Sequence, residues 1–268
     1  MNYFESLILG IIQGTTEFLP VSSSGHLVIF QNLFNIVSDN VAFEVVVHLG
    51  TLMSVIVVYY SDIAHMAKSF FTSVFSGNIS QAYKNDSYFK LALLVLVGTI
   101  PAVFTGLVLA DFFKEIFHNI KLVSSTLILT GVILFITRFV KVQNQKNTVL
   151  KALIIGLGQA MAILPGISRS GTTISTSLFM GLGRKESARF SFLMSIPVIV
   201  GAASFELNDF FSEGFTSGEL GVMLIGFVSS FITGYIAIKF MLKVIQTGKF
   251  SWFAPYCIAT GLLVLLVL

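Results

Sequence analysis

Three side chains suited to acid–base and anion chemistry lie in apolar parts of this sequence. Glu17 and His26 flank a serine-rich turn, and Arg169 lies in a second serine-rich turn far along the chain. A carboxylate at membrane depth is costly unless it is paired, hydrated or bound to a metal, and an uncompensated guanidinium there is costly too. Together the three groups predict a buried anion site with an acid–base group beside it.

The two turns are versions of one stretch. A shift of 146 positions aligns GIIQGTTEFLPVSSSGH, which starts at position 10, with GLGQAMAILPGISRSGT, which starts at position 156. The shift pairs Gly10 with Gly156, Gln13 with Gln159, Ser22 with Ser168, Ser24 with Ser170 and Gly25 with Gly171. Each copy is an apolar run that stops at a proline, crosses a Ser/Gly-rich turn and resumes. Two broken helices in matching halves of a membrane protein indicate a binding site.

The composition is that of an integral membrane protein. Of the 268 residues, 55% are hydrophobic and 11% charged, against about 25% charged in soluble domains, and the mean hydropathy is +0.89. We therefore expect one membrane domain over 1–268, with no separate soluble domain and no nucleic-acid partner. The opening residues lack a basic region and carry Glu5, so they are not interpreted as a cleaved signal peptide.

Apolar runs predict the elements that position the two turns. The half-segments around each turn are roughly 10–13 residues long, about half a bilayer, which fits re-entrant hairpins over Glu5–Leu33 and Val149–Leu182. Full-length runs lie near Phe43–Tyr60, Leu91–Leu109, Leu122–Phe139, Phe190–Phe205, Leu220–Phe240 and Trp252–Leu268. The prediction is an all-α polytopic membrane protein with two inverted repeats (about 1–140 and 149–268), each containing one re-entrant helical hairpin and three transmembrane helices.

The basic residues predict the orientation. On this topology thirteen of the 16 Lys and Arg residues fall in one set of connections, whereas Lys114 and Lys121 fall in the opposite set with most of the acids. Basic loops stay in the cytoplasm, so both chain ends should lie outside. The longer connection 61–90 is then cytoplasmic, with an amphipathic interfacial stretch around Ala64–Phe75. The hairpins enter from opposite faces, and their tips meet inside the membrane.

Several polar groups of the two turns are candidate phosphate ligands. Gln13 and Glu17 are four residues apart and share a helix face. A helix that starts at a serine-rich turn presents backbone N–H groups that attract anions. The candidates of this kind are Gln13, Ser22, Ser24, Gly25, Ser168, Ser170, Gly171, Thr172 and Thr173. The competing interpretation is structural: serine caps and a permanent Arg169–Glu17 pair that joins the hairpins.

Phosphate attached to a lipid suits such a site, because the lipid tail can arrive through the bilayer. Ser23 can attack with His26 as base, His26 can itself be the nucleophile, or Glu17 or His26 can activate a water; the spacing leaves these open. Glu17 beside phosphate oxygens also suits a hard divalent cation. The other histidines, His48, His65 and His118, are interpreted as surface or interface residues.

The stretches QGTTEFLPVSSSGH (13–26) and LPGISRSGTT (164–173) resemble the two signatures of bacterial undecaprenyl-diphosphate phosphatases, also called bacitracin-resistance proteins. Length and span order agree along the whole chain. The resemblance implies hydrolysis of undecaprenyl diphosphate, which recycles the carrier lipid of cell-wall synthesis and confers bacitracin resistance. It also implies a bacterial plasma-membrane location, a site open to the outer face and a requirement for Mg²⁺ or Ca²⁺.

By position, the resemblance makes Glu17 and residue 13 the family's acidic pair, Ser23 its hydroxyl, His26 its imidazole and Arg169 its phosphate clamp. Residue 13 is Gln here, which weakens any mechanism that needs two carboxylates and leaves Glu17 as the metal-binding candidate. A homodimer is a further expectation from the family. A transporter or flippase of phosphorylated polyprenyl lipid is the alternative function, because inverted repeats with broken helices suit it equally well.

Overall fold

The computed structural model describes residues 1–33, 41–117, 119–212 and 217–267, and within these ranges the chain forms helices and no strand. The predicted all-α class is confirmed. The helices are α1 (Tyr3–Phe18), α2 (Ser23–Leu33), α3 (Val41–Val58), α4 (Tyr60–Phe75), α5 (Ile79–Asn85), α6 (Ser87–Val108), α7 (Ala110–Ile116), α8 (Ile120–Ile136), α9 (Val149–Met161), α10 (Arg169–Phe179), α11 (Arg184–Ser212), α12 (Ser217–Gln246) and α13 (Ala254–Val267), with short 3-10 helices η1 (Thr137–Phe139) and η2 (Phe250–Phe253).

Five helical segments among the described residues are long and apolar enough to cross a membrane. They cover Ser87–Val108, Ile120–Phe139, Arg184–Ser204, Glu219–Gln246 and Phe250–Val267. These ranges agree with five of the six predicted spans. The sixth prediction falls on α3, which passes the same test only together with α4 and meets it at a bend of 82°. A multi-pass membrane protein is confirmed, while the division into two repeats stays a prediction.

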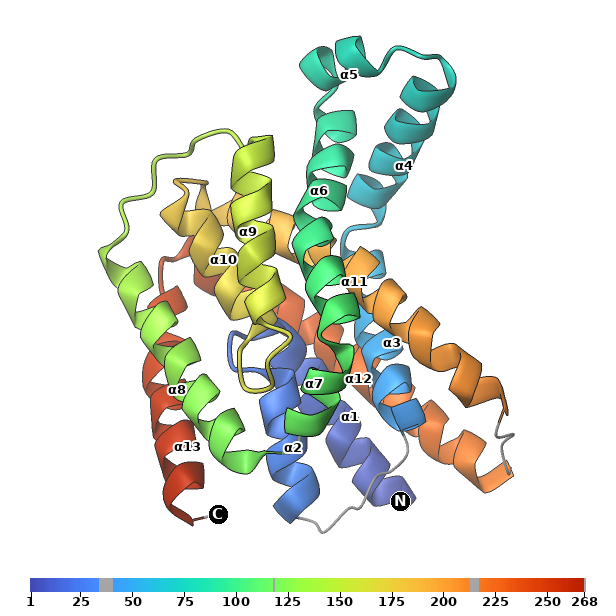
Figure 1. The fold of residues 1–268 in the computed structure, drawn as a ribbon, viewed down its shortest axis with the longest axis vertical. Coiled ribbons are helices and arrows are strands. Elements are labelled where there is room, and N and C mark those ends of the chain that lie inside the picture. The colour runs from blue at the N-terminus through green and yellow to red at the C-terminus, as the bar shows by residue number, and fades with distance from the viewer. Residues whose placement is uncertain (34–40, 118, 213–216, 268) are drawn as a thin grey trace.

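The two broken segments form helical hairpins that enter the bundle from opposite ends (Figure 1). α1 and α2 form the first hairpin, which opens toward the end where both chain termini lie. α9 and α10 form the second, which opens toward the other end. Ser170 in the second hairpin donates a hydrogen bond to the Leu19 carbonyl in the first turn, at 3.1 Å. The tips of the two hairpins are therefore in contact.

The first hairpin is held by close backbone packing of α1 on α12. A Cβ atom built at Gly10 would lie 2.7 Å from the Gly226 carbonyl oxygen, and one at Gly14 would lie 2.4 Å from that of Ser230. α3 approaches α12 as closely, since a Cβ at Gly50 would lie 2.5 Å from the Phe227 carbonyl oxygen. Lipid-immersed helices associate by van der Waals packing rather than by release of water, so small residues are needed where their backbones meet.

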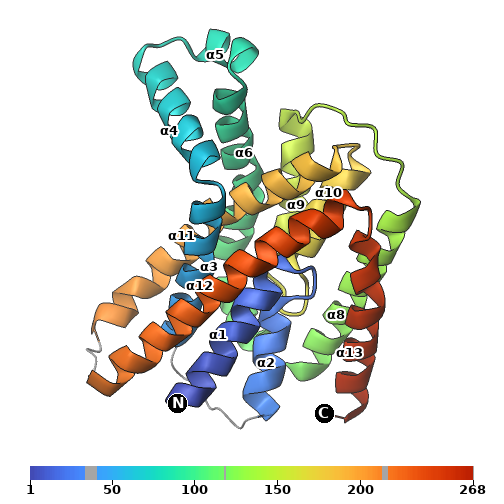
Figure 2. The ribbon, with the colours of Figure 1, turned by 180° about the vertical axis from the view of Figure 1, so that it is seen from behind.

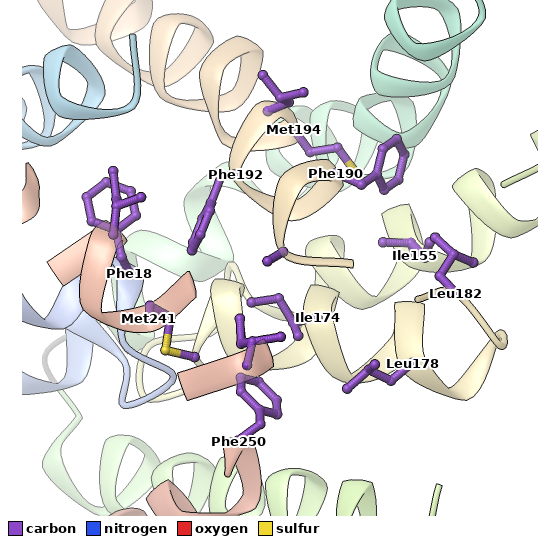
Figure 3. Packing of buried hydrophobic residues seen from close by; sticks show 14 of the residues in the cluster. Phe18, Ile155, Ile174, Leu178, Leu182, Phe190, Phe192, Met194, Met241 and Phe250 are labelled. Atoms are coloured by element: carbon purple, nitrogen blue, oxygen red, sulfur yellow. The ribbon is translucent and has the colours of Figure 1, made fainter. Parts of the chain in front are cut away.

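The main apolar core surrounds the ends of both hairpins (Figure 3). It includes Phe18 at the end of α1, Ile174 in α10, Phe192 in α11 and Met241 in α12, all completely buried. The Phe18 and Phe192 rings meet edge to face with centroids 5.6 Å apart. Because Phe18 directly follows Glu17, this packing fixes the position of the carboxylate.

The predicted amphipathic stretch around Ala64–Phe75 lies within α4, which packs against the first half of α6. The two helices and α5 extend beyond the rest of the molecule in Figure 1. Phe70 stacks on Phe89 at 6.0 Å between ring centroids. At its other end α4 is tied to α11, because Arg189 donates from Nε and Nη2 to the Asp62 carboxylate at 2.9 and 2.8 Å. α4 is thus held by α6 along its length and by α11 next to the bend that follows α3.

Candidate active site

The first turn breaks because of Pro20. The residue before a proline avoids the helical region, and Leu19 is extended, with ψ of 144°. Ser22 then takes the left-handed conformation, with φ of 67°, which non-glycine residues seldom adopt. The chain re-enters a helix at Ser23, where the Gly25 N–H donates to the Ser22 hydroxyl at 3.2 Å. Proline and a serine cap therefore place Ser23 at the tip of the first hairpin.

The second turn repeats this construction. Gly166 after Pro165 has φ of +88°, and a Cβ there would lie 2.3 Å from a backbone oxygen of α8. Ser168 caps α10, with the Gly171 N–H donating to its hydroxyl at 3.0 Å. This bond corresponds to the one between Gly25 and Ser22 in the first turn. Arg169 is therefore the first helical residue after the second break.

Helix α8 satisfies the buried backbone of the second turn. Thr126 donates to the Pro165 carbonyl at 2.5 Å, Thr130 donates to the Gly166 carbonyl at 3.0 Å, and the Ser168 N–H donates to Thr130 at 3.1 Å. Irregular backbone at membrane depth is tolerated where protein groups take up its hydrogen bonds. These threonines allow the tip to stay non-helical inside the bundle.

Glu17 is the centre of the site. It is 8% exposed, and its Oε2 accepts from Gln13 Nε2 at 2.9 Å and from the Ser23 hydroxyl at 2.6 Å. Its Oε1 accepts from Nη2 of Arg169. The two hairpins thus bring Glu17, Ser23 and Arg169 together, and a charge pair joins their tips.

Two polar atoms beside this cluster are buried and have no hydrogen-bond partner among the described residues. They are Nη1 of Arg169 and Oε1 of Gln13. An unpaired buried donor costs free energy, and more so when it is charged. Arg169 therefore uses one nitrogen for Glu17, and the other is a candidate donor to a phosphate oxygen, which the planar guanidinium suits.

His26 is buried near the same turn but does not contact Ser23. Its Nδ1 lies 2.8 Å from the Ser22 carbonyl oxygen, and its Nε2 lies 2.7 Å from the Tyr256 hydroxyl. Both ring nitrogens are therefore occupied. In this arrangement the Ser23 hydroxyl is hydrogen-bonded to Glu17 and not to His26. Of the mechanisms that the sequence left open, the pairing of Ser23 with His26 as its base is therefore not the one seen here.

Most of the other predicted phosphate ligands have protein partners in this structure. Ser22 lies 3.3 Å from Ser24, and Ser168 lies 3.2 Å from Ser170, hydroxyl to hydroxyl. The remaining partners are backbone or buried hydroxyls: Thr172 donates to the Ser168 carbonyl, Thr173 donates to the Arg169 carbonyl and meets Ser191, and Gly25 and Gly171 donate to cap serines. These groups shape the tips, and Arg169 is the one with a free buried donor.

Two residues near the site were missed from the sequence. The sequence predicts a surface or interface position for His48, without a role at the site; its Nε2 lies 3.9 Å from Glu17 Oε2, and its Nδ1 lies 2.7 Å from the Glu44 carbonyl oxygen. The signal was present, since an ionisable residue inside an apolar run is a functional candidate by default. Tyr256 gave no such signal, because tyrosine near a span end is common. His65 is on the surface, as expected, and His118 lies outside the described residues.

The residues present fit a divalent cation in part. Among the described residues, no group of three His, Cys, Asp or Glu side chains is close enough to hold a metal ion. Gln13 Oε1 is nevertheless a buried oxygen without a partner, next to the Glu17 carboxylate. Oxygen ligands of this kind suit Mg²⁺ and Ca²⁺, and Mg²⁺ sites commonly combine one or two carboxylates with substrate phosphates. The protein can therefore supply only some of the ligands that such a cation needs.

Comparison with known proteins gives a consistent result. A family model described as "Bacitracin resistance protein BacA" matches residues 6–263. Proteins named "Undecaprenyl-diphosphatase" from Desulforapulum autotrophicum and Desulfosudis oleivorans are 40% and 42% identical, with 98% and 97% of this chain covered and 97% of each relative. One of the same name from Korarchaeum cryptofilum is 42% identical over the full length of both chains.

Proposed function

Because this chain belongs to the bacitracin resistance protein BacA family, we propose that it is an integral membrane phosphatase that hydrolyses undecaprenyl diphosphate to undecaprenyl phosphate and phosphate. The names of its relatives support the substrate. The reaction recycles the carrier lipid of cell-wall synthesis and, by removing the diphosphate form, confers bacitracin resistance.

One observation carries this proposal: only one of the two terminal nitrogens of the Arg169 guanidinium has a hydrogen-bond partner among the described residues. Nη2 holds the carboxylate, while Nη1 is buried without a partner among the described residues. A phosphate oxygen is the kind of acceptor that Nη1 lacks. Preorganised donors of this kind stabilise the negative charge that develops in phosphoryl transfer. A purely structural ion pair would not require the second nitrogen to stay unsatisfied.

The contacts of Ser23 support it as the nucleophile. Its hydroxyl already donates to Glu17 at 2.6 Å, within the range of a general base. As Ser23 Oγ bonds to the terminal phosphorus, its proton passes to Glu17, and the bond to the bridging oxygen breaks to release undecaprenyl phosphate. A water molecule then attacks the phosphoserine and releases phosphate, which restores Ser23. Atoms balance as one diphosphate and one water giving two monophosphates.

We propose that the divalent cation arrives with the substrate. Glu17 and the Gln13 carbonyl oxygen would meet it, and the diphosphate oxygens would complete its ligands. When bound, the cation neutralises charge on the phosphate groups. This protein would then hold little Mg²⁺ or Ca²⁺ before substrate binds.

The distribution of basic residues supports a site that is open to the outer face of the bacterial plasma membrane, with both termini on that face. The same end of the molecule holds both termini and the open end of the first hairpin (Figure 1). A homodimer is a separate expectation, which comes from the family resemblance.

The test is phosphate release from C55 diphosphate by the purified protein in detergent. We expect Arg169→Ala to lower the rate by about 100-fold or more, the effect of removing a key transition-state donor, and His26→Ala to lose activity as well. Arg138→Ala, which removes an exposed guanidinium in η1, is the matched control and should keep wild-type activity. Substantial turnover by Arg169→Ala would contradict the site.

The alternative function is transport of phosphorylated polyprenyl lipid, which the opposed hairpins also suit. An assay with the protein in lipid vesicles distinguishes transport from hydrolysis. Protein that moves lipid phosphate across the bilayer but releases no inorganic phosphate would favour the transporter.

A further inference from the structure

Tyr256 in α13 holds the His26 ring, although it lies 230 residues away in sequence. The two rings are nearly parallel, at 10°, with centroids 5.7 Å apart. A carbonyl oxygen only accepts, so the bond to Ser22 requires the proton of neutral His26 to sit on Nδ1. Nε2 is then an acceptor, and the Tyr256 hydroxyl donates to it. The two bonds together fix both the tautomer and the orientation of the ring.

His26 in turn holds the backbone just before Ser23. The Ser22 carbonyl accepts from Nδ1 of His26 at 2.8 Å and from its backbone N–H at 3.1 Å. Ser22 is left-handed, with φ of 67°, a conformation that serine keeps only when its surroundings enforce it. Because Ser23 follows directly, the imidazole helps to keep the Ser23 hydroxyl at 2.6 Å from Glu17.

α13 contacts the first turn through two consecutive residues. Beside the Tyr256 bond, the Cys257 thiol donates to the Pro20 carbonyl at 3.3 Å. α13 itself runs beside α8 at the edge of the bundle in both views (Figure 2). This helix therefore supports the turn from a side that neither hairpin covers.

We propose that Tyr256 is a positioning residue of the phosphatase reaction, acting through His26 on the Ser22–Ser23 turn. The proposal rests on the proposed function, with Ser23 as the attacking hydroxyl. Loss of the Tyr256 hydroxyl would leave Nε2 of His26 as a buried acceptor without its partner. The turn would then sample orientations in which Ser23 is further from Glu17.

The first test is the steady-state kinetics of Tyr256→Phe. Because Arg169 is untouched, we expect kcat to fall about tenfold, the equivalent of one hydrogen bond, while KM changes by less than about twofold. The matched control is Tyr88→Phe, which removes the hydroxyl from a second stacked His–Tyr pair, His65 and Tyr88 at 4.9 Å, far from the turns. The control should keep wild-type kcat.

The second test measures the tautomer and the hydrogen bonding of the His26 ring directly. In ¹⁵N NMR of the histidine side chains, His26 should show the Nδ1–H tautomer, and Tyr256→Phe should move its Nε2 resonance. His26→Asn, which keeps a donor near the Ser22 carbonyl, should retain more activity than His26→Ala. A Tyr256→Phe protein with wild-type kcat and unchanged His26 resonances would overturn the proposal. If even the wild type releases no phosphate, the proposed function fails, while the NMR comparison still tests the bond.

Discussion

At the scale of single residues, Glu17 is the point where the contacts of the site converge. Gln13, Ser23 and Arg169 all donate to its carboxylate, from positions 4, 6 and 152 residues away. With three donors, one of them charged, the ionised form of a carboxylate is stabilised even where water is scarce. The site therefore keeps Glu17 in the ionised form that a general base requires.

Gln13→Glu tests how far this arrangement depends on the amide. The substitution places a second carboxylate where Gln13 Nε2 now lies, 2.9 Å from Glu17 Oε2, and two carboxylates so close require a shared proton or a cation. We expect activity to be kept or raised, with a stronger dependence on Mg²⁺ or Ca²⁺. Phosphate release measured over a series of cation concentrations checks this.

Gln159, the counterpart of Gln13 in the second hairpin, provides the control. Both polar atoms of its side chain are buried without a partner among the described residues. Gln159→Glu should not gain a stronger cation dependence. An inactive Gln13→Glu protein would mean that the amide N–H itself is required.

At the scale of elements, each hairpin depends on a neighbouring helix that approaches it closely. Glycines in α1 let the backbone of α12 come within contact distance, and α9 meets α6 in the same way, since a Cβ at Gly156 would lie 2.3 Å from the Gly98 carbonyl oxygen. Van der Waals contact between these closely packed backbones adds to the hydrogen bonds that hold each hairpin.

Gly14→Ala should therefore loosen the first hairpin. The new methyl would lie 2.4 Å from the Ser230 carbonyl oxygen, which cannot move aside as a flexible side chain can. We expect a destabilisation of about 1–3 kcal/mol and reduced phosphate release, measured by thermal unfolding in detergent and by activity. Gly201→Ala is the control, because nothing lies within 4 Å of the added methyl. Equal melting temperatures for the two variants would contradict this packing.

The breaks in both hairpins could be predicted from the sequence because their causes are local. Pro20 and Pro165 stop a helix, and Ser22 and Ser168 cap the next one, all within a few residues. Tyr256 could not be predicted, since its role depends on where α13 packs. The approach of His48 to Glu17 could not be predicted either, since it depends on how α3 packs beside the first hairpin.

At the scale of the whole molecule, the termini and the open end of the first hairpin lie at one end, and α4, α5 and the start of α6 project from the other (Figure 1). Thirteen of the 16 basic residues belong to connections predicted on the side of that projection. The charge pattern therefore predicts that this projection lies on the cytoplasmic side.

Cysteine labelling in intact cells tests this orientation. Lys121→Cys, at the start of α8, should react with a thiol reagent that cannot cross the membrane, whereas Asn78→Cys, between α4 and α5, should react only after the cells are opened. Both positions are exposed, and the native Cys257 is buried, so background labelling should be low. The reverse pattern would mean that the molecule is inserted the other way round.

The ion pair between the hairpins also has a consequence for how the chain is made. Glu17 is synthesised 152 residues before Arg169, which at about 5–20 residues per second is a delay of roughly 8–30 s. Of the groups that lie beside this carboxylate in the finished fold, Gln13, Ser23 and His48 are all made before Arg169. The first half of the chain therefore brings its own polar partners for Glu17 before the arginine is made.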